Sequence, residues 1–276
     1  MLKAKAKAVT ALTGGVEYLL KKNKVDYIKG TASFASATDL DISLLDGGST
    51  QISAKNIIIA TGSEVTPFPG VEIDEVQIVS STGALDLQKV PEKLVIIGAG
   101  VIGLEMGSVW ARLGAKVEVV EYMGIIGGTG MDGGIAKAFQ KILTKQGFKF
   151  SLNTKVMGVE KKDGKVVVNV EGAKDGKAST VSTFLTSSKL KTHSSVQIDA
   201  DVVLVAIGRR PVTTGLGLEK IGVEVDNKGR IVIDSEFNTS VKGIKCIGDV
   251  TFGPMLAHKA EEEGSFIVRT CRKNRS

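Results

Sequence analysis

The chain has 276 residues, which at roughly 150 residues per domain is enough for about two domains with cores of their own. Its 33 glycines are about 12% of the sequence against a usual value of about 7%, and its two cysteines exclude a disulfide-framed fold and a cysteine-rich zinc site. The formal net charge of +6 comes from basic clusters near both ends without interleaved aromatic residues, so we expect no nucleic-acid partner. No apolar run has the length of a membrane span, and there are only two histidines, so we expect neither a membrane partner nor a metal site.

The first part of the chain predicts one helix followed by short strands. Apolar positions at helical spacing, with lysines on the other face, predict an amphipathic helix over residues 2–22. Alternating apolar and polar residues then predict strands over 25–28, 32–34, 40–45 and 51–60, with a hairpin turn at Asp46-Gly47-Gly48. A short helix is expected over residues 80–85.

Strands and helices alternate after Pro91. The pattern predicts a strand at 94–97, a helix at 104–113, a strand at 116–120, a helix at 132–146, a strand at 149–152 and a hairpin of 156–162 with 165–171. Such alternation indicates an α/β fold with a parallel sheet. Residues 173–200, rich in Ser, Thr and Lys, are expected to be irregular. Strands at 201–207, 223–225, 231–233 and 244–247 and a helix at 254–268 complete the chain.

A dinucleotide-binding motif lies between the predicted strand 94–97 and the helix that follows it. The motif Gly98-Ala99-Gly100-Val101-Ile102-Gly103 has the GxGxxG spacing, in which glycines permit a tight turn and a close approach to a pyrophosphate. Glu121 ends the next predicted strand, where a carboxylate accepts hydrogen bonds from ribose hydroxyls and repels a 2′-phosphate. The motif therefore predicts NAD(H) binding in preference to NADP(H). The alternative is a structural glycine turn with a surface glutamate, and Glu105 in the first helical turn equally fits a helix-capping role.

Four segments together resemble the dihydrolipoamide (dihydrolipoyl) dehydrogenase family of class I pyridine nucleotide-disulfide oxidoreductases. They are Ile59-Ala60-Thr61-Gly62-Ser63, residues 98–110, residues 206–211, and Gly248-Asp249-Val250 with GPMLAHKAEEEG at 253–264. The resemblance implies an oxidoreductase that uses FAD and NAD, with a Rossmann-like NAD-binding domain of three-layer ββα character inserted in an incomplete FAD-binding domain. It implies a remainder of the FAD-binding domain over 1–88, the NAD-binding domain over 89–210, and a return segment over 211–276 whose tail, 265–276, is unrelated to the family.

The resemblance also assigns cofactor contacts and partners. NAD would contact Gly98, Ala99, Gly100, Val101, Ile102, Gly103, Leu104, Glu105, Glu121, Val156 and Gly208. FAD would contact Gly30, Thr61, Gly62, Ser63, Asp249, Met255, Leu256, Ala257 and His258. In the family, Glu105 lies near the stacked nicotinamide and flavin, and His258 is not the catalytic base. The implied partners are a second copy of the chain and the lipoyl-bearing acyltransferase core of 2-oxoacid dehydrogenase complexes, and the implied location in a eukaryote is the mitochondrial matrix.

The family reaction passes two electrons from dihydrolipoamide through a redox disulfide and FAD to NAD⁺, giving lipoamide and NADH. The family's Cys-x4-Cys pair and its His-Glu base have no counterpart in the sequence, so no catalytic residue is assigned beyond Glu105. Cys246, on a predicted buried strand, and Cys271 are expected to be inert. We therefore expect the chain to keep NAD binding, to bind FAD weakly or not at all, and to lack complete catalysis.

Two alternative functions stay open: a non-catalytic NAD(H)-binding module or truncated isoform, and an NADPH-dependent disulfide reductase. An irregular insert at about 175–198 interrupts the family pattern. Within it, residues 181–197 are read either as a retained intron or as a natural surface-loop insertion.

Overall fold

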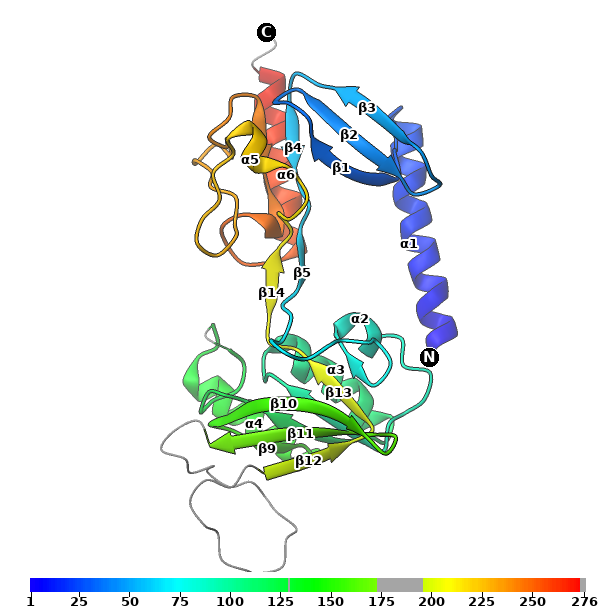
Figure 1. Ribbon diagram of the computed structural model, residues 1–276, viewed down its shortest axis with the longest axis vertical. Coiled ribbons are helices and arrows are strands. Elements are labelled where there is room, and N and C mark those ends of the chain that lie inside the picture. Colours follow the sequence, from blue (N-terminus) through cyan, green and yellow to red (C-terminus); the bar gives the residue numbers. More distant parts are fainter. Residues whose placement is uncertain (129, 173–195, 274–276) are drawn as a thin grey trace, which may run out of the picture. The chain divides into compact units, whose positions relative to one another are not determined.

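The computed structural model describes residues 1–128, 130–172 and 196–273 (Figure 1). Contacts divide the chain into two compact units, one formed by Met1–Glu64 with Arg209–Ser276 and the other by Val65–Gly208. The unit of Val65–Gly208, here called the central unit, contains the glycine motif and Glu121. The other unit, here called the split unit, contains the residues for which the resemblance implies FAD contacts.

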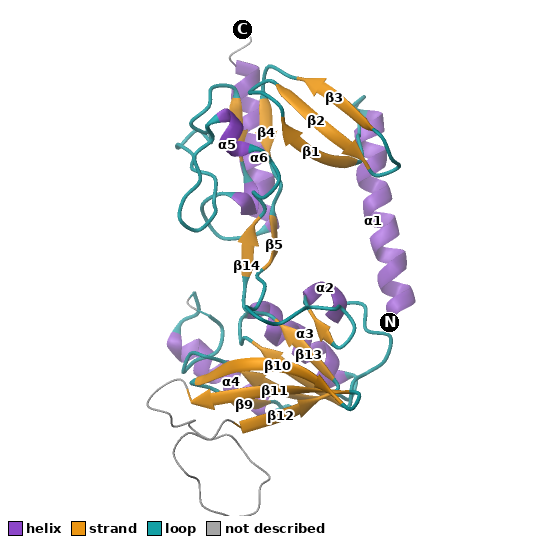
Figure 2. Cartoon of the chain, in the orientation of Figure 1, coloured by secondary structure: helices purple, strands orange, loops and turns teal. Residues whose placement is uncertain are grey.

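The central unit has a five-stranded parallel sheet, a three-stranded antiparallel sheet and helices (Figures 1 and 2). Its elements are β6 (Ile78–Val79), α2 (Ser81–Ala84), β7 (Lys93–Ile97), α3 (Val101–Arg112), β8 (Lys116–Val120), α4 (Gly133–Lys145), β9 (Lys149–Ser151), β10 (Thr154–Lys162), β11 (Lys165–Gly172), β12 (Val196–Ala200) and β13 (Val202–Val205). The strand order is β6-β13-β7-β8-β9 in the parallel sheet and β10-β11-β12 in the antiparallel sheet. Residues 65–88, grouped with the first segment in the sequence analysis, contribute β6 to the parallel sheet.

The parallel sheet is the middle layer of three. Successive side chains of β7 point to opposite faces, as strand geometry requires. Leu94 and Ile96 pack in a core with residues of α3 and α4, whereas Val95 and Ile97 pack in a second core with the valines of β11. Both faces are covered, which explains why β7 reads as a continuous apolar run. The predicted α/β fold with ββα layering is confirmed.

The split unit contains small sheets around a third core. Its elements are α1 (Leu2–Lys22), β1 (Gly30–Phe34), β2 (Asp39–Leu44), β3 (Ser49–Ser53), β4 (Ile57–Ile59), β5 (Ser63–Val65), β14 (Arg209–Pro211), α5 (Leu218–Ile221), β15 (Ile244–Cys246), the 3-10 turn η1 (Gly248–Val250) and α6 (Ala257–Lys273). Strands β1, β2 and β3 form an antiparallel sheet, β4 pairs with β15 in parallel, and β5 pairs with β14. Ile59 and Cys246 are opposite each other in the β4–β15 ladder and are buried in the core.

The structure corrects several of the predicted elements. Residues 25–28 form no strand, and their apolar side chains are exposed. The strand expected over 51–60 is two strands, β3 and β4, because each half pairs with a different partner. Residues 223–225 and 231–233 share only the isolated bridge Val225–Ile231. Residues 196–200, expected to be irregular, form β12, while 173–195, which hold most of the proposed insert, lie outside the described residues.

Candidate functional site: a dinucleotide turn and a carboxylate clamp

The glycine motif lies at the carboxyl ends of two neighbouring parallel strands. β7 pairs with β8, so Ile97 and Val120 end at the same edge of the sheet, where α/β proteins bind ligands. The N–H of Gly98 donates to the carbonyl of Val120 at 2.9 Å. Gly98 has a φ of +104°, and a Cβ there would lie 2.5 Å from the carbonyl oxygen of Ala206. Both the backbone angle and the close approach of β13's end require glycine at this position.

The other two motif glycines meet different surroundings. A Cβ on Gly103 would lie 2.3 Å from the carbonyl oxygen of Gly98, so this glycine permits α3 to pack close to its own turn. A Cβ on Gly100 would have no neighbour within 4 Å, which means that the space beside this residue is open. Gly100 is the N-cap of the 12-residue helix α3, whose first N–H groups have no partner within the helix. An open glycine at a helix N-terminus fits a pyrophosphate group.

Glu121 connects the end of β8 to the glycine turn. One carboxylate oxygen, Oε2, accepts from the N–H of Ala99 at 2.7 Å, and Oε1 accepts from the N–H of Met123 at 2.7 Å. Each carboxylate oxygen has two acceptor positions, so one position on each oxygen stays available for a ribose hydroxyl. Glu121 is only partly buried, which leaves these positions accessible to a ligand. The carboxylate, the open Gly100 and the N-terminus of α3 fit NAD(H).

The remaining NAD residues implied by the resemblance lie around this turn or under it. The N–H of Thr154, the first residue of β10, donates to the carbonyl of Glu121 at 2.9 Å, and Val156 follows two residues later with its side chain buried. Gly208 has a φ of +122° and follows the β13 segment that packs on Gly98. On α3, Val101 and Glu105 are exposed and Ile102 is partly buried, whereas Leu104 is in the core below the helix.

A second group of polar side chains lies in the split unit. Ser63 donates from Oγ to the Oδ2 atom of Asp249 at 2.7 Å, and Arg209 donates from Nε to the same hydroxyl at 2.7 Å. Because a guanidinium only donates, the hydroxyl of Ser63 accepts from Arg209 and must direct its single proton to Asp249. The Oδ1 atom of Asp249 therefore stays available to accept from a ligand hydroxyl, which fits the ribityl chain of FAD.

The structure joins some of the other implied FAD residues to this group. The hydroxyl of Thr61 donates to the carbonyl of Val212 at 2.7 Å, and the N–H of Val212 donates to the carbonyl of Gly62 at 3.0 Å. These bonds tie residues 61–63 to the chain after β14. Gly30 starts β1, where a Cβ would lie 2.6 Å from the Cγ2 atom of Ile42, so its packing alone requires glycine.

The other implied FAD residues lie at the start of α6 or just before it, a few positions after Asp249. The partly exposed Met255 and the exposed Leu256, Ala257 and His258 precede or begin the helix. Their exposure leaves them accessible, and which of them contact FAD stays a prediction.

Arg209 is the residue of this group that sequence reasoning missed. It contacts Ser63 through two bonds, the second from Nη2 to the Ser63 carbonyl at 2.5 Å, although 146 positions separate the two residues. The only signal was an arginine directly after Gly208, at the point where a strand ends. Without a structure, that signal does not reveal the partner.

Cys246 is a free, fully buried cysteine on β15. Burial raises the pKa of its thiol to about 12, with a further rise from the negative charge of Glu263. A thiol held neutral in a core is a poor nucleophile, which agrees with the inert role expected for it. Among the described residues, no group of three or more His, Cys, Asp or Glu side chains is arranged to hold a metal ion, and no helix is long and apolar enough to cross a bilayer.

The fold places the chain in the Rossmann-like class of α/β proteins, and these two groups of residues are its candidate cofactor sites. The sequence model of the pyridine nucleotide-disulphide oxidoreductase family matches residues 2–264. The chain belongs to this family, whose members use FAD and NAD, and the resemblance noted from the sequence is confirmed at that level.

Two curated relatives and two solved structures illustrate the match. The chain is 55% identical over 273 residues to dihydrolipoamide dehydrogenase of Chaetomium thermophilum, covering 99% of this chain and 51% of that protein. It is 54% identical over 269 residues to the mitochondrial dihydrolipoyl dehydrogenase of Homo sapiens, covering 97% and 50%. The chain thus spans about half the length of the curated relatives it matches.

The structural comparison gives the same class. An HOCl-induced flavoprotein disulfide reductase of Escherichia coli superposes with a TM-score of 0.83 at 26% identity, covering 98% of this chain and 56% of that one. A Mycobacterium tuberculosis protein, LpdA, superposes with a TM-score of 0.83 at 22% identity, covering 98% and 55%, and shows the shared fold.

Proposed function

We propose that this chain provides the NAD(H)-binding site, and part of the FAD site, of a dihydrolipoyl dehydrogenase. The observation that carries the proposal is the carboxylate of Glu121, which lies at the end of β8 and accepts from the turn residue Ala99 at 2.7 Å. It stands beside the open Gly100 at the N-terminus of α3, where a dinucleotide pyrophosphate fits. Identities of 54–55% to dihydrolipoyl dehydrogenases support the choice of reaction.

The preference for NAD(H) over NADP(H) follows from charge. A 2′-phosphate placed on the adenosine ribose would face the Glu121 carboxylate, whose oxygens accept hydrogen bonds from hydroxyls but repel an anion. The residues directly after Glu121 are Tyr122, Met123 and Gly124, so no arginine follows to neutralise a phosphate. This arrangement disfavours the alternative of an NADPH-dependent disulfide reductase.

The flavin half of the proposal rests on Asp249. Bound FAD supplies the two-electron chemistry between a dithiol and the nicotinamide. The task of the chain is to bind and orient the cofactors: Arg209 and Ser63 leave one oxygen of Asp249 free for a ribityl hydroxyl, while the central unit holds NAD(H). The overall reaction of a dihydrolipoyl dehydrogenase converts dihydrolipoamide and NAD⁺ to lipoamide, NADH and a proton.

The same likeness supports proposals about partners and location. The partners would be a second copy of the chain and the lipoyl-bearing acyltransferase core of a 2-oxoacid dehydrogenase complex. The name of the human relative includes the word mitochondrial, so the proposed location is the mitochondrial matrix.

Titration of the purified chain with NADH and with NADPH tests the proposal, read by nicotinamide fluorescence. We expect NADH to bind at least about tenfold more tightly, which corresponds to about 1.4 kcal/mol. Tighter binding of NADPH would favour the reductase alternative. Adding FAD tests the flavin half: weak flavin binding would support it, and NADH binding without any flavin binding would favour a non-catalytic NAD(H)-binding module. We expect no NADH from dihydrolipoamide and NAD⁺ in either case, because the sequence has no counterpart of the family's Cys-x4-Cys pair.

A further inference from the structure

Two charged side chains of α6 form a largely buried ion pair. Nζ of Lys259 lies 2.8 Å from Oε1 of Glu263, one helical turn further on, and the two side chains are only 16% and 12% exposed. Exposed pairs at this spacing contribute little to stability because water screens them. A pair with so little exposure needs additional partners to offset the loss of hydration.

Those additional partners are both backbone groups of one residue. The N–H of Gly248 donates to Oε2 of Glu263 at 2.7 Å, and Nζ of Lys259 donates to the Gly248 carbonyl at 3.1 Å. Gly248 has a φ of +76°, and a Cβ there would lie 3.3 Å from the Cβ of Ala260. The two side chains of the ion pair therefore bond to both backbone groups of a left-handed glycine that lies close to α6 and directly precedes Asp249.

We propose that Lys259 and Glu263 are positioning residues for the flavin site, which act by fixing the backbone on which the Asp249 carboxylate is mounted. Ser63 orients the carboxylate itself, through a 2.7 Å bond to Oδ2. The ion pair sets the position of the Asp249 backbone, and Ser63 sets the rotation of its side chain. Together they place Oδ1 to accept from a polyol hydroxyl, the chemistry of the ribityl chain. The inference rests on the proposed function in that FAD is the ligand.

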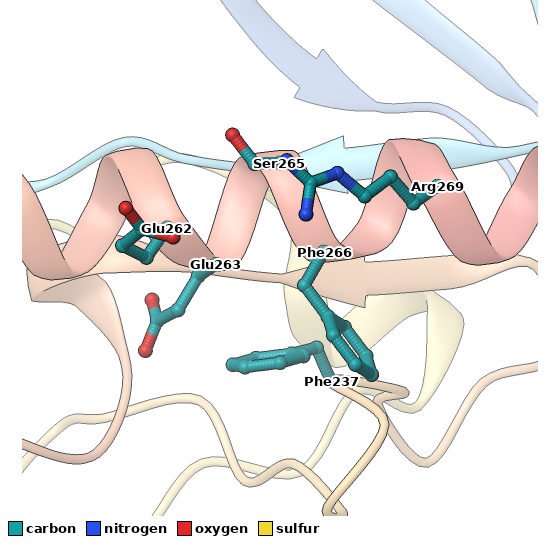
Figure 3. A pocket seen from close by; sticks show the side chains of 6 residues that line it. All are labelled: Phe237, Glu262, Glu263, Ser265, Phe266 and Arg269. Atoms are coloured by element: carbon teal, nitrogen blue, oxygen red, sulfur yellow. The ribbon is translucent and has the colours of Figure 1, made fainter.

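The neighbouring Glu262 provides a matched control. Glu262 and Glu263 both line a cavity of about 330 Å³, whose other lining residues are Phe237, Ser265, Phe266 and Arg269 (Figure 3). Figure 3 shows the two carboxylates pointing in different directions from α6. Glu262 is exposed, whereas Glu263 bonds to Gly248. Replacing Glu262 therefore removes a similar charge from the same helix and leaves the bonds to Gly248 in place.

The experiment compares the wild-type chain with Glu263→Leu, Glu263→Gln, Lys259→Met and Glu262→Gln. Two quantities are measured: the FAD dissociation constant from flavin fluorescence, and hydrogen exchange at the Gly248 amide without cofactor. We expect Glu263→Leu and Lys259→Met to raise the FAD dissociation constant about tenfold or more, because each leaves a buried charge or peptide group unpaired. Glu263→Gln keeps an oxygen acceptor for Gly248 and should recover part of the affinity. Glu262→Gln should match the wild type.

Exchange at Gly248 should accelerate about tenfold or more in Glu263→Leu and not in Glu262→Gln. The NADH dissociation constant should stay within about twofold in every variant, because that site is built from the central unit. Unchanged exchange at Gly248 in Glu263→Leu would show that Glu263 does not hold the Gly248 backbone in place. Faster exchange with unchanged FAD affinity would overturn its positioning role. A wild-type chain that binds no FAD would instead overturn the flavin half of the proposed function. Exchange at Gly248 would still show whether the ion pair holds the backbone of that residue.

Discussion

The carboxylate of Glu121 accepts a hydrogen bond from the backbone N–H of Ala99 at 2.7 Å. The residue that is proposed to select the cofactor is thus bonded to the turn that is proposed to bind its pyrophosphate. The second oxygen accepts from Met123 at 2.7 Å, so the carboxylate also fixes the chain that leaves β8. The proposed selection of the cofactor and the bonds that hold the turn therefore depend on the same side chain, so we expect a substitution of Glu121 to affect both.

Replacement of Glu121 by glutamine should weaken NADH binding about tenfold or more and reduce the preference over NADPH. Glutamine keeps an oxygen acceptor but loses the charge, and hydrogen bonds to charged groups contribute about 1.5–3 kcal/mol. The NADH and NADPH dissociation constants of wild type and variant provide the measurement. The control is Glu92→Gln, because Glu92 is an exposed carboxylate directly before the first residue of β7, at the end of the strand away from the glycine turn. An unchanged ratio of the two constants would show that Glu121 does not select the cofactor.

Alanine at Gly98 and at Gly100 should have opposite consequences. At Gly98 the φ of +104° and a Cβ 2.5 Å from the Ala206 carbonyl strain the folded state, so we expect Gly98→Ala to lower the free energy of unfolding by about 2 kcal/mol or more. At Gly100 the φ is −73° and no atom lies within 4 Å of a Cβ, so the fold should tolerate alanine while the new methyl group obstructs the pyrophosphate. Urea unfolding and NADH titration of both variants separate the two effects. Equal losses of stability would contradict this reading of the turn.

The central unit could be predicted well because its signals are local. The apolar run of β7, the glycines after it and the acid at the end of β8 follow one another within a single strand–helix–strand unit. β8 begins and ends at the predicted residues, Lys116 and Val120. Periodicity and turn chemistry suffice where neighbours in sequence are neighbours in space.

The split unit was predicted less well because its partners are distant in the sequence. Ile57–Ile59 pairs with Ile244–Cys246, a partner that no local pattern reveals, and so β4 was merged with β3. Val25 and Tyr27 alternate with polar residues as in a strand, yet they are 51% and 56% exposed and no described strand pairs with them. Distance in the sequence also hid the contacts of Arg209 with Ser63, which are 146 positions apart.

The thiol of Cys246 should resist alkylation in the folded chain. Its pKa is raised to about 12 by burial, and the thiolate is the reactive form, so almost none is present even at pH 9. Treatment with iodoacetamide at pH 8, followed by mass spectrometry of the peptide containing Cys246, should show labelling only after urea is added. Labelling at the same rate with and without urea would mean that β15 is not held in the core.

The stability of the central unit should depend on pH through Asp74. Burial raises the pKa of its carboxyl, but the ion pair with Lys161 and the N–H groups of Val76, Ile78 and Gln77 outweigh burial, and the pKa falls to about 2. The unfolded value is about 3.9, so the charged form stabilises the fold by about 2–3 kcal/mol. This contribution is complete above about pH 4 and is lost as the pH falls toward about 2.

Asp74→Asn removes this charge and should lower the free energy of unfolding by about 2–3 kcal/mol at pH 7. The difference from wild type should narrow below about pH 4, because protonation makes the wild-type side chain neutral as well. Urea unfolding at pH 7, 4 and 2.5 measures it. Asp163→Asn serves as the control, since Asp163 is exposed at a φ of 50° that asparagine also adopts. A difference that stays constant across this pH range would mean that the contacts of Asp74 stabilise the loop by their geometry and not by its charge.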